Sequence, residues 1–382
     1  MADMFDVLRA SLFTDEAVPL SDWQPVFEEM KQQTVAALPG VWLQTHLNAP
    51  AWMKYCLMQQ AQWVRLMHAQ DQLIRLLEKG GIPCVILKGA AAAMAYPHPT
   101  LRAMGDVDFL VKRADLERAA ALLETNGYAL THEKENQDHH YGYQKDGIHF
   151  ELHWRTPLYS RIDDALLARF EPGIDAREWH ETEGHAFPTL PVTLNGLVLM
   201  LHIDQHLRSG LGLRQIIDWM MYVHTLPPEK WKELQPMLER AGIKKLALTV
   251  TALCQRYLGL EKIVEEDPSL PVDALLTYIL EQGNFGRKAG FDGKISSFAR
   301  TVSTPGGFFR RLQSGGLANW NAAKKHVALK PFAWVYQSFR ILGMLIRQKR
   351  SPGAFLKHRR HGVEQRSLIR ALDLELERKL PL

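Results

Sequence analysis

The pattern of hydrophobic and polar positions changes along the chain and divides it into four parts. Apolar side chains at spacings of three and four over residues 42–77 predict a long helix, which Gly80 and Gly81 end. Residues 82–87 are a short apolar run with β-branched side chains, typical of a buried strand. After residue 157 the helical spacing returns, and it predicts helices at 163–169, 194–206, 213–224, 228–241, 244–258 and 272–282.

The segment between these two helical stretches mixes helices with strands. An alanine-rich helix is predicted at 89–96 and an amphipathic helix at 114–125. A Lys-Asp-Gly turn joins the last two of the following strands into a hairpin. Strands are predicted at 106–111, 128–132, 140–144 and 148–154. The fold class is therefore α+β, a small mixed sheet flanked by helices, with a helical N-terminal segment and a helical C-terminal lobe.

Composition allows a large buried core. The chain has 382 residues, 46% of them hydrophobic, which is enough for two or three domains. Cys56, Cys84 and Cys254 lie far apart in apolar segments, so we expect reduced core thiols. No apolar run reaches the ~18 residues of a membrane span, and the acidic start shows no secretory signal. We expect a cytoplasmic protein, with peripheral association at the membrane as the alternative.

Two aspartates, Asp106 and Asp108, stand one residue apart in a predicted strand. Side chains alternate along a strand, so both carboxylates project from the same face. Two carboxylates at that distance repel each other unless a cation lies between them. The pair therefore indicates a divalent-metal site, with a solvated strand end or a helix cap as the alternative.

A third carboxylate, Glu151, lies in the alternating strand at 148–154. Ile148, Phe150, Leu152 and Trp154 would form its buried face, leaving His149, Glu151 and His153 on the other. We expect a hairpin to bring this face beside the aspartates. Transfer assisted by two metal ions needs such a third carboxylate, as a metal ligand or as the base that activates the attacking hydroxyl. The alternative is an exposed strand position.

Phosphate-binding features come just before the aspartates. Lys88 and Gly89 end a strand and open a helix, where free backbone N–H groups favour phosphate. Lys88 adds a mobile positive charge, and Arg102 would clamp phosphate with two hydrogen bonds. Arg102 has an equal alternative, a salt bridge to Asp106. A divalent-metal site that faces a phosphate site indicates phosphoryl or nucleotidyl transfer.

The ordered set resembles the nucleotidyltransferase superfamily of the DNA polymerase beta fold. Within it, the chain is most similar to the bacterial "uncharacterised nucleotidyltransferase" family, over about residues 80–225. The motifs that carry the resemblance are Leu87-Lys88-Gly89, Arg102 with Asp106-Val107-Asp108, and Glu151-Leu152-His153-Trp154. The wider superfamily places Ser or Gly after the first glycine, whereas this chain has Ala90. The Lys-Gly and Arg-x₃-Asp-x-Asp arrangement also resembles nucleotidyltransferase toxins of toxin–antitoxin systems.

The resemblance implies a magnesium-dependent enzyme that moves a nucleoside monophosphate from an NTP, ATP for example, to an acceptor hydroxyl or phosphate, releasing pyrophosphate. Asp106, Asp108 and Glu151 would be catalytic and hold two Mg²⁺ ions, with Mn²⁺ as an alternative ion. Protein, RNA and small molecules all stay open as acceptors. The alternative function is a non-catalytic, nucleotide-binding adaptor. The expected divisions are 1–80, a helical segment; 81–157, the minimal catalytic unit; 158–292, a helical lobe; and 293–382, a basic helical module.

Four histidines and one aspartate are candidates for supporting roles. His149 and His153 could orient Glu151 or simply lie on the sheet surface. His202 and His206 fall four apart on a predicted helix, as a zinc pair would, but core or supporting roles are favoured without a third ligand. Asp218, which the family pattern places near the cleft, is expected to pair with Arg208 or Arg214.

The charge is unevenly distributed. Residues 293–363 contain 14 Lys and Arg and no Asp or Glu, and the charges of residues 364–382 balance. Because the net charge of the chain is +4, residues 1–292 have a net charge of about −10. An apolar-rich helix is predicted at 332–347, followed by the basic runs 347–350 and 357–360. Such a module binds an anionic membrane surface or nucleic acid, or packs on the protein with a solvated cationic edge.

Overall fold

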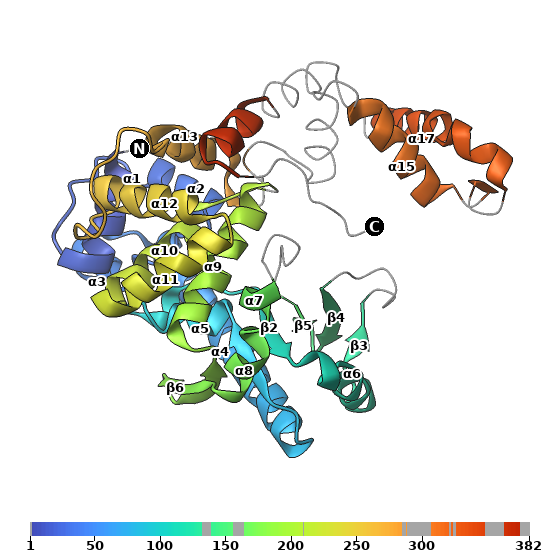
Figure 1. Ribbon diagram of the computed structural model, residues 1–382. Coiled ribbons are helices and arrows are strands. Elements are labelled where there is room, and N and C mark those ends of the chain that lie inside the picture. The colour runs from blue at the N-terminus through green and yellow to red at the C-terminus, as the bar shows by residue number, and fades with distance from the viewer. Residues whose placement is uncertain are drawn as a thin grey trace.

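A five-stranded sheet lies among helices from the N-terminal and central parts of the chain (Figure 1). The structure is a computed structural model that describes residues 2–131, 139–155, 164–208, 210–284, 288, 307–320, 322–323, 326–347 and 363–374. Helices dominate these residues, and the strands are confined to two sheets. The predicted α+β class is therefore confirmed.

The larger sheet has the strand order β1-β2-β5-β4-β3. Its strands are β1 (Cys84–Leu87), β2 (Asp106–Val111), β3 (Ala129–Leu130), β4 (His140–Lys145) and β5 (Ile148–His153). The predicted hairpin forms between β4 and β5. It places β5 parallel to β2 in the middle of the sheet, while the other neighbours are antiparallel. The two strands that carry the candidate carboxylates are thus direct neighbours.

The sheet has one apolar face and one face that carries polar groups. Val107, Phe109, Phe150 and Leu152 are buried on the apolar face against helices α4 (Pro50–Lys79) and α6 (Leu116–Thr125). Strand alternation then turns the residues between them to the opposite face. The clean alternation read from the sequence at 148–154 is therefore what directs Glu151 away from the core.

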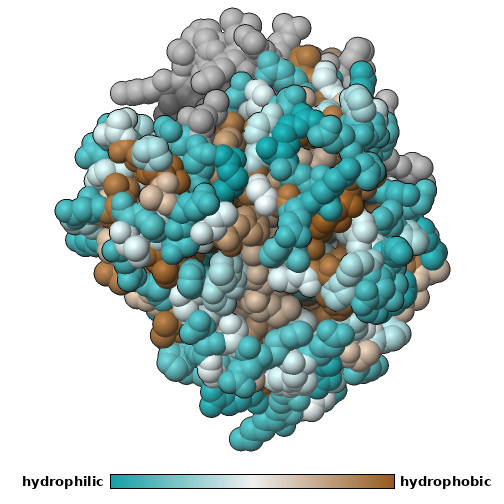
Figure 2. Space-filling view, turned by 90° about the vertical axis from the view of Figure 1, so that its left-hand side faces the viewer, coloured by the Kyte–Doolittle hydropathy of each residue, from teal (hydrophilic) through white to brown (hydrophobic). Residues whose placement is uncertain are grey.

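Helices cover the second face and form the larger core. α9 (Val192–Leu207), α10 (Leu213–Thr225), α11 (Pro228–Arg240), α12 (Lys244–Tyr257) and α13 (Val272–Gln282) share one hydrophobic cluster with α1 (Ala2–Arg9), α2 (Gln24–Gln32) and α3 (Gly40–His46). Cys56, Cys84 and Cys254 are free and buried, as predicted. Figure 2 shows a mostly hydrophilic outer face on the left-hand side of Figure 1, with hydrophobic side chains in separate small patches.

Three predicted elements needed correction. The helix at 42–77 is two helices, because Pro50 starts α4 at a position where its missing N–H is not needed. The helix at 89–96 is the shorter α5 (Gly89–Ala93). The stretch after residue 157 is not wholly helical, since β6 (Glu178–Thr182) and β7 (His185–Thr189) form a separate hairpin beside α7 (Asp164–Leu167) and α8 (Phe170–Asp175) in the chain.

The basic C-terminal segment is described only in part. Helices α15 (Gly307–Asn319) and α17 (Ala333–Arg347) pack together, so the predicted helix at 332–347 is present. The basic residues 348–350 and 357–360 lie outside the described residues. Residues 363–371 form a helix held to the lobe by Gln365, which donates to the Leu207 carbonyl at 2.7 Å. Within the described ranges, no helix has the length and apolar character needed to cross a membrane.

Candidate active site

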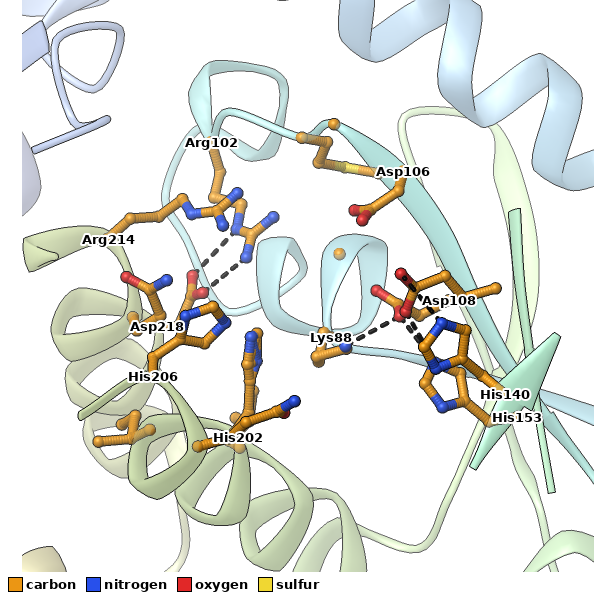
Figure 3. Close-up of a pocket in the computed structure, with 18 of the residues that line it drawn as sticks. Lys88, Arg102, Asp106, Asp108, His140, His153, His202, His206, Arg214 and Asp218 are labelled. Atoms are coloured by element: carbon orange, nitrogen blue, oxygen red, sulfur yellow. Dashed lines mark hydrogen bonds and ion pairs between the residues drawn. The ribbon is translucent and has the colours of Figure 1, made fainter. Parts of the chain in front are cut away.

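A pocket opens between the polar face of the sheet and helices α9 and α10 (Figure 3). Its volume of about 290 Å³ is close to the lower end for small-molecule sites. The sheet contributes three carboxylates and two imidazoles, and helices α9 and α10 contribute two imidazoles, one guanidinium and one carboxylate. The polar lining residues are Lys88, Arg102, Asp106, Asp108, His139, His140, Glu151, His153, His202, Gln205, His206, Arg214, Gln215 and Asp218.

The three predicted carboxylates come from the two parallel strands. Asp108 pairs in register with Glu151, and Asp106 pairs with His149. Asp108, Glu151 and His153 each place a potential ligand atom within 4.8 Å of the others. Asp106 lines the same pocket from the upper end of β2 but is outside that group (Figure 3). The carboxylates thus share a face, with Asp108 and Glu151 as the close pair.

Lys88 and His153 hold Asp108. Its Oδ1 lies 2.8 Å from Lys88 Nζ and 2.9 Å from His153 Nε2. Burial alone would raise the pKa of Asp108, but Lys88 and the His153 hydrogen bond hold it well below the usual range. His153 Nε2 also lies 3.2 Å from Glu151 Oε2, and His140 Nε2 lies 3.8 Å from Glu151 Oε1. The acidic cluster is therefore neutralised by the chain's own basic groups.

The same contacts shift the basic partners. Burial would lower the pKa of both Lys88 and His153, yet the surrounding carboxylates raise each of them. Asp106 behaves differently, because burial and the neighbouring charge of Asp108 raise its pKa to about 6. The repulsion expected from the spacing of the two aspartates thus raises the pKa of Asp106, whereas the pKa of Asp108 stays low.

Lys88 reaches the pocket from a strained turn between β1 and α5. Its backbone has φ +51° and ψ −126°, a conformation that costs a non-glycine residue on the order of 1–3 kcal/mol. Gly89 continues the turn with φ +23°. This geometry directs the Lys88 ammonium to Asp108 (Figure 3). Because α5 has only five residues, its dipole is weak, and the side chain carries most of the positive charge at this end of the pocket.

Arg102 fastens the segment before β2 to α10. Its Nε and Nη2 donate to the two carboxylate oxygens of Asp218 at 3.0 and 2.6 Å, and Tyr96 donates to the same group at 2.7 Å. The expectation that Asp218 pairs with Arg208 or Arg214 is therefore wrong, since Asp218 pairs with Arg102. The alternative salt bridge from Arg102 to Asp106 is also not what forms. All three groups of the Arg102–Asp218–Tyr96 cluster are buried.

The helical wall opposite the carboxylates carries His202, His206 and Arg214 (Figure 3). The two imidazole rings lie 4.2 Å apart, but no third metal ligand joins them among the described residues. Burial and the nearby charge of Lys88 lower the pKa of His206 to about 3 and that of His202 well below its usual value, so both are neutral at pH 7. His149 is exposed and does not line the pocket.

Arg214 is a pocket residue to which sequence reasoning gave no direct role. Its Nη1 donates to the Ala103 carbonyl at 3.2 Å, and its buried Nε has no hydrogen-bond partner in the described part of the chain. Burial and the charge of Arg102 lower the pKa of the guanidinium. Where the structure describes the chain, no carboxylate forms an ion pair with it. Its position in α10, one turn before Asp218, was the available signal.

Comparison with known proteins shows to which family the chain belongs. The family described as uncharacterised nucleotidyltransferase matches residues 19–259. The chain belongs to this family. It is therefore a nucleotidyltransferase enzyme, as the sequence motifs predicted. No curated protein matches the chain.

Two solved structures give partial structural matches. The solution structure of the antibiotic-resistance factor ANT(2'')-Ia has 15% sequence identity and a TM-score of 0.32, over 50% of this chain and 95% of that chain. The crystal structure of an antigenic nucleotidyltransferase-like protein from Paracoccidioides brasiliensis has 16% identity and a TM-score of 0.34. That match covers 52% of this chain and 94% of the other.

Removing the Asp218 carboxylate should destabilise the protein. Asp218→Ala leaves the Arg102 guanidinium buried without its counter-charge, and breaking such a pair costs about 3–5 kcal/mol of unfolding free energy. Urea denaturation measures the change. Glu233→Ala, which breaks an exposed ion pair with Lys230, is the control and should change stability little. Equal stability of the two variants would contradict a structural role for Asp218.

Because the pKa of Asp106 is raised, we expect Asp106→Asn to be more stable than wild type by an amount that depends on pH. Both proteins are measured without divalent metal. An unfolded carboxyl releases its proton near pH ~4, whereas folded Asp106 holds it to about pH 6. Wild type therefore loses stability relative to the variant as pH rises between these values, by on the order of 3 kcal/mol. Denaturation from pH 4 to 8, with the exposed Asp175→Asn as control, measures it. A difference that does not vary with pH would refute the shift.

Proposed function

We propose that this enzyme catalyses metal-dependent transfer of a nucleoside monophosphate from an NTP to an acceptor bound between the sheet and α9. One observation carries the proposal. The register of the parallel strands β2 and β5 places Asp108 directly beside Glu151, on the face where Asp106 also lies, with Lys88 at hydrogen-bond distance. This arrangement combines closely spaced carboxylates with a phosphate-binding cation in one pocket.

The donor set fits Mg²⁺. Mg²⁺ prefers oxygen ligands, and Asp106, Asp108 and Glu151 supply carboxylate oxygens from one sheet face. In the chain alone, Lys88 and His153 provide the positive charge that this acidic group needs. We therefore assign Asp106, Asp108 and Glu151 as the residues that would hold two Mg²⁺ ions, with Mn²⁺ as the alternative. When bound, these ions would supply Lewis-acid stabilisation of the transferring phosphate.

The triphosphate would bind to Lys88, Gly89 and Arg214. Lys88 adds a charge that its flexible stem can move from Asp108 to a phosphate oxygen. Gly89 offers its backbone N–H beside that charge. Arg214 lines the pocket with a buried, unpartnered Nε, so it supplies the planar donor group first expected of Arg102. Arg102 would instead position α10 through Asp218, because two of its nitrogens already donate there.

The proton of the acceptor would pass to Glu151. An acceptor oxygen attacks the α-phosphorus, the bond to pyrophosphate breaks, and the acceptor loses its proton to a base. Glu151 is half-buried at the pocket wall and is held by His153 and His140, which would orient it. Neutral His202 and His206 line the helical wall opposite Glu151 and can exchange hydrogen bonds with an uncharged acceptor group.

Replacing Asp108 should abolish transfer. Asp108→Asn keeps an oxygen for Lys88 and His153 but removes a metal-binding charge worth several kcal/mol, so the rate should fall at least about 100-fold. The assay uses α-phosphate-labelled ATP, CTP, GTP and UTP with Mg²⁺. RNA, protein, lipid and small molecules fractionated from cell extract serve as acceptors. The exposed Asp175→Asn is the matched control.

Label that enters one fraction with wild type and with Asp175→Asn, but not with Asp108→Asn, supports the proposal and names the acceptor class. Transfer by Asp108→Asn within tenfold of wild type would overturn the assignment of Asp108. Failure of wild type to label any fraction, despite nucleotide binding, would count against transfer to these acceptors.

Removing Arg214 should weaken nucleotide binding. A hydrogen bond to a charged group is worth about 1.5–3 kcal/mol, so Arg214→Ala should raise the Kd of a non-hydrolysable NTP with Mg²⁺ at least about tenfold. Calorimetric titration measures the Kd, and Arg75→Ala, an exposed arginine of α4, is the control. An unchanged Kd in a folded Arg214→Ala variant would exclude this residue from the triphosphate site.

A further inference from the structure

Three histidines meet at the end of the pocket where β4 begins and β5 ends. His140 pairs in register with His153, and His139 precedes His140. The ring centroids of His139 and His140 lie 4.5 Å apart, those of His140 and His153 5.1 Å, and those of His139 and His153 5.8 Å. Each ring offers a nitrogen within 4.8 Å of the other two. Figure 3 shows His140 and His153 side by side next to Asp108.

Two of these imidazoles have a buried nitrogen that has no hydrogen-bond partner among the described residues. These atoms are Nδ1 of His140 and Nδ1 of His153. His153 as a whole is 1% exposed. A buried polar atom without a partner costs about 1–3 kcal/mol, so two adjacent ones point to a ligand that completes the cluster.

The chemistry of this cluster differs from that of the carboxylates beside it. Imidazole nitrogen binds Zn²⁺ and related transition metals well, whereas Mg²⁺ and Ca²⁺ take oxygen ligands. Glu151 approaches His140 and His153 at their Nε2 atoms, not at the unpartnered Nδ1 atoms, and does not belong to the group of three imidazoles. Three imidazoles are an established protein ligand set for a four-coordinate zinc ion whose fourth position is open to water.

We propose that His139, His140 and His153 form a binding site for a divalent transition-metal ion such as Zn²⁺. Zinc–nitrogen bonds of about 2.0–2.1 Å need ligand nitrogens roughly 3.4 Å apart, so the rings must close on the ion by small rotations. The site shares His153 with the carboxylate cluster but does not depend on the reaction proposed above.

Calorimetric titration of ZnCl₂ into the full-length, chelator-stripped protein tests the site without nucleotide or acceptor. Wild type should bind Zn²⁺, and His140→Ala should bind it at least about tenfold more weakly, the smallest loss expected even for a residue that only supports a ligand. His98→Ala, which removes an exposed histidine outside the pocket, is the control and should match wild type. Millimolar Mg²⁺ should not displace the ion, because the histidines select against it.

Equal zinc affinity in wild type and His140→Ala would overturn the proposal, as would displacement of zinc by Mg²⁺ at similar concentrations. Thermal denaturation checks that each variant is folded. If His140→Ala is not folded, His139→Ala takes its place, since His139 lies outside the strands and its loss should spare the sheet. Co²⁺ gives a second readout, because a tetrahedral imidazole site produces strong visible absorption that the oxygen-only site would not.

Discussion

The buried carboxylate of Asp108 constrains the whole site, because a buried charge requires opposite charge at contact distance. Lys88 meets this need from the turn after β1 and His153 hydrogen-bonds to Asp108 from β5, and each depends on the local backbone to do so. Lys88 reaches Asp108 only because the strained turn after β1 points it there. His153 reaches it because β5 runs parallel to β2 in the register that also brings Glu151 alongside. The acidic cluster therefore exists as a consequence of the sheet topology.

A second buried ion pair forms the other half of the pocket. Arg102 leaves the loop before β2 and binds Asp218 of α10, which ties the helical lobe to the strand that carries the aspartates. This contact fixes α10 so that Arg214, one turn earlier, lines the pocket. The result is that the sheet carboxylates face a helical wall that carries Arg214 and two neutral imidazoles. Such opposed charges suit a ligand that combines metal ions with a polyphosphate.

The sequence predicted much of the sheet face that carries the carboxylates, because strand alternation is a local property. Ile148, Phe150 and Leu152 are buried on one face as expected, and this alone turns Glu151 to the other. The aspartates followed from the same argument. By contrast, β6 and β7 lack an apolar alternation, since residues 178–189 are largely polar and include Pro188. Their turn at Glu183 and Gly184, both with positive φ, is the main local signal.

Sequence patterns did not predict which residues far apart in the chain pair with each other. Nothing local to Arg102 distinguishes Asp106 from Asp218, which is 116 residues away, as its partner. The grouping of His139 and His140 with His153 depends likewise on the register of β4 against β5. The family match over residues 19–259 and the predicted motifs agree on nucleotidyl transfer, while the pocket supplies the residues through which we propose it proceeds.

Electron paramagnetic resonance of Mn²⁺ tests most directly whether the β2–β5 carboxylates hold a metal–nucleotide complex. The spectrum would be recorded on the chelator-stripped enzyme with a non-hydrolysable NTP. We expect coupling between the bound Mn²⁺ and phosphorus nuclei of the nucleotide, and its loss in Glu151→Gln. Mn²⁺ that binds without phosphorus coupling, or with the same coupling in Glu151→Gln, would contradict the account.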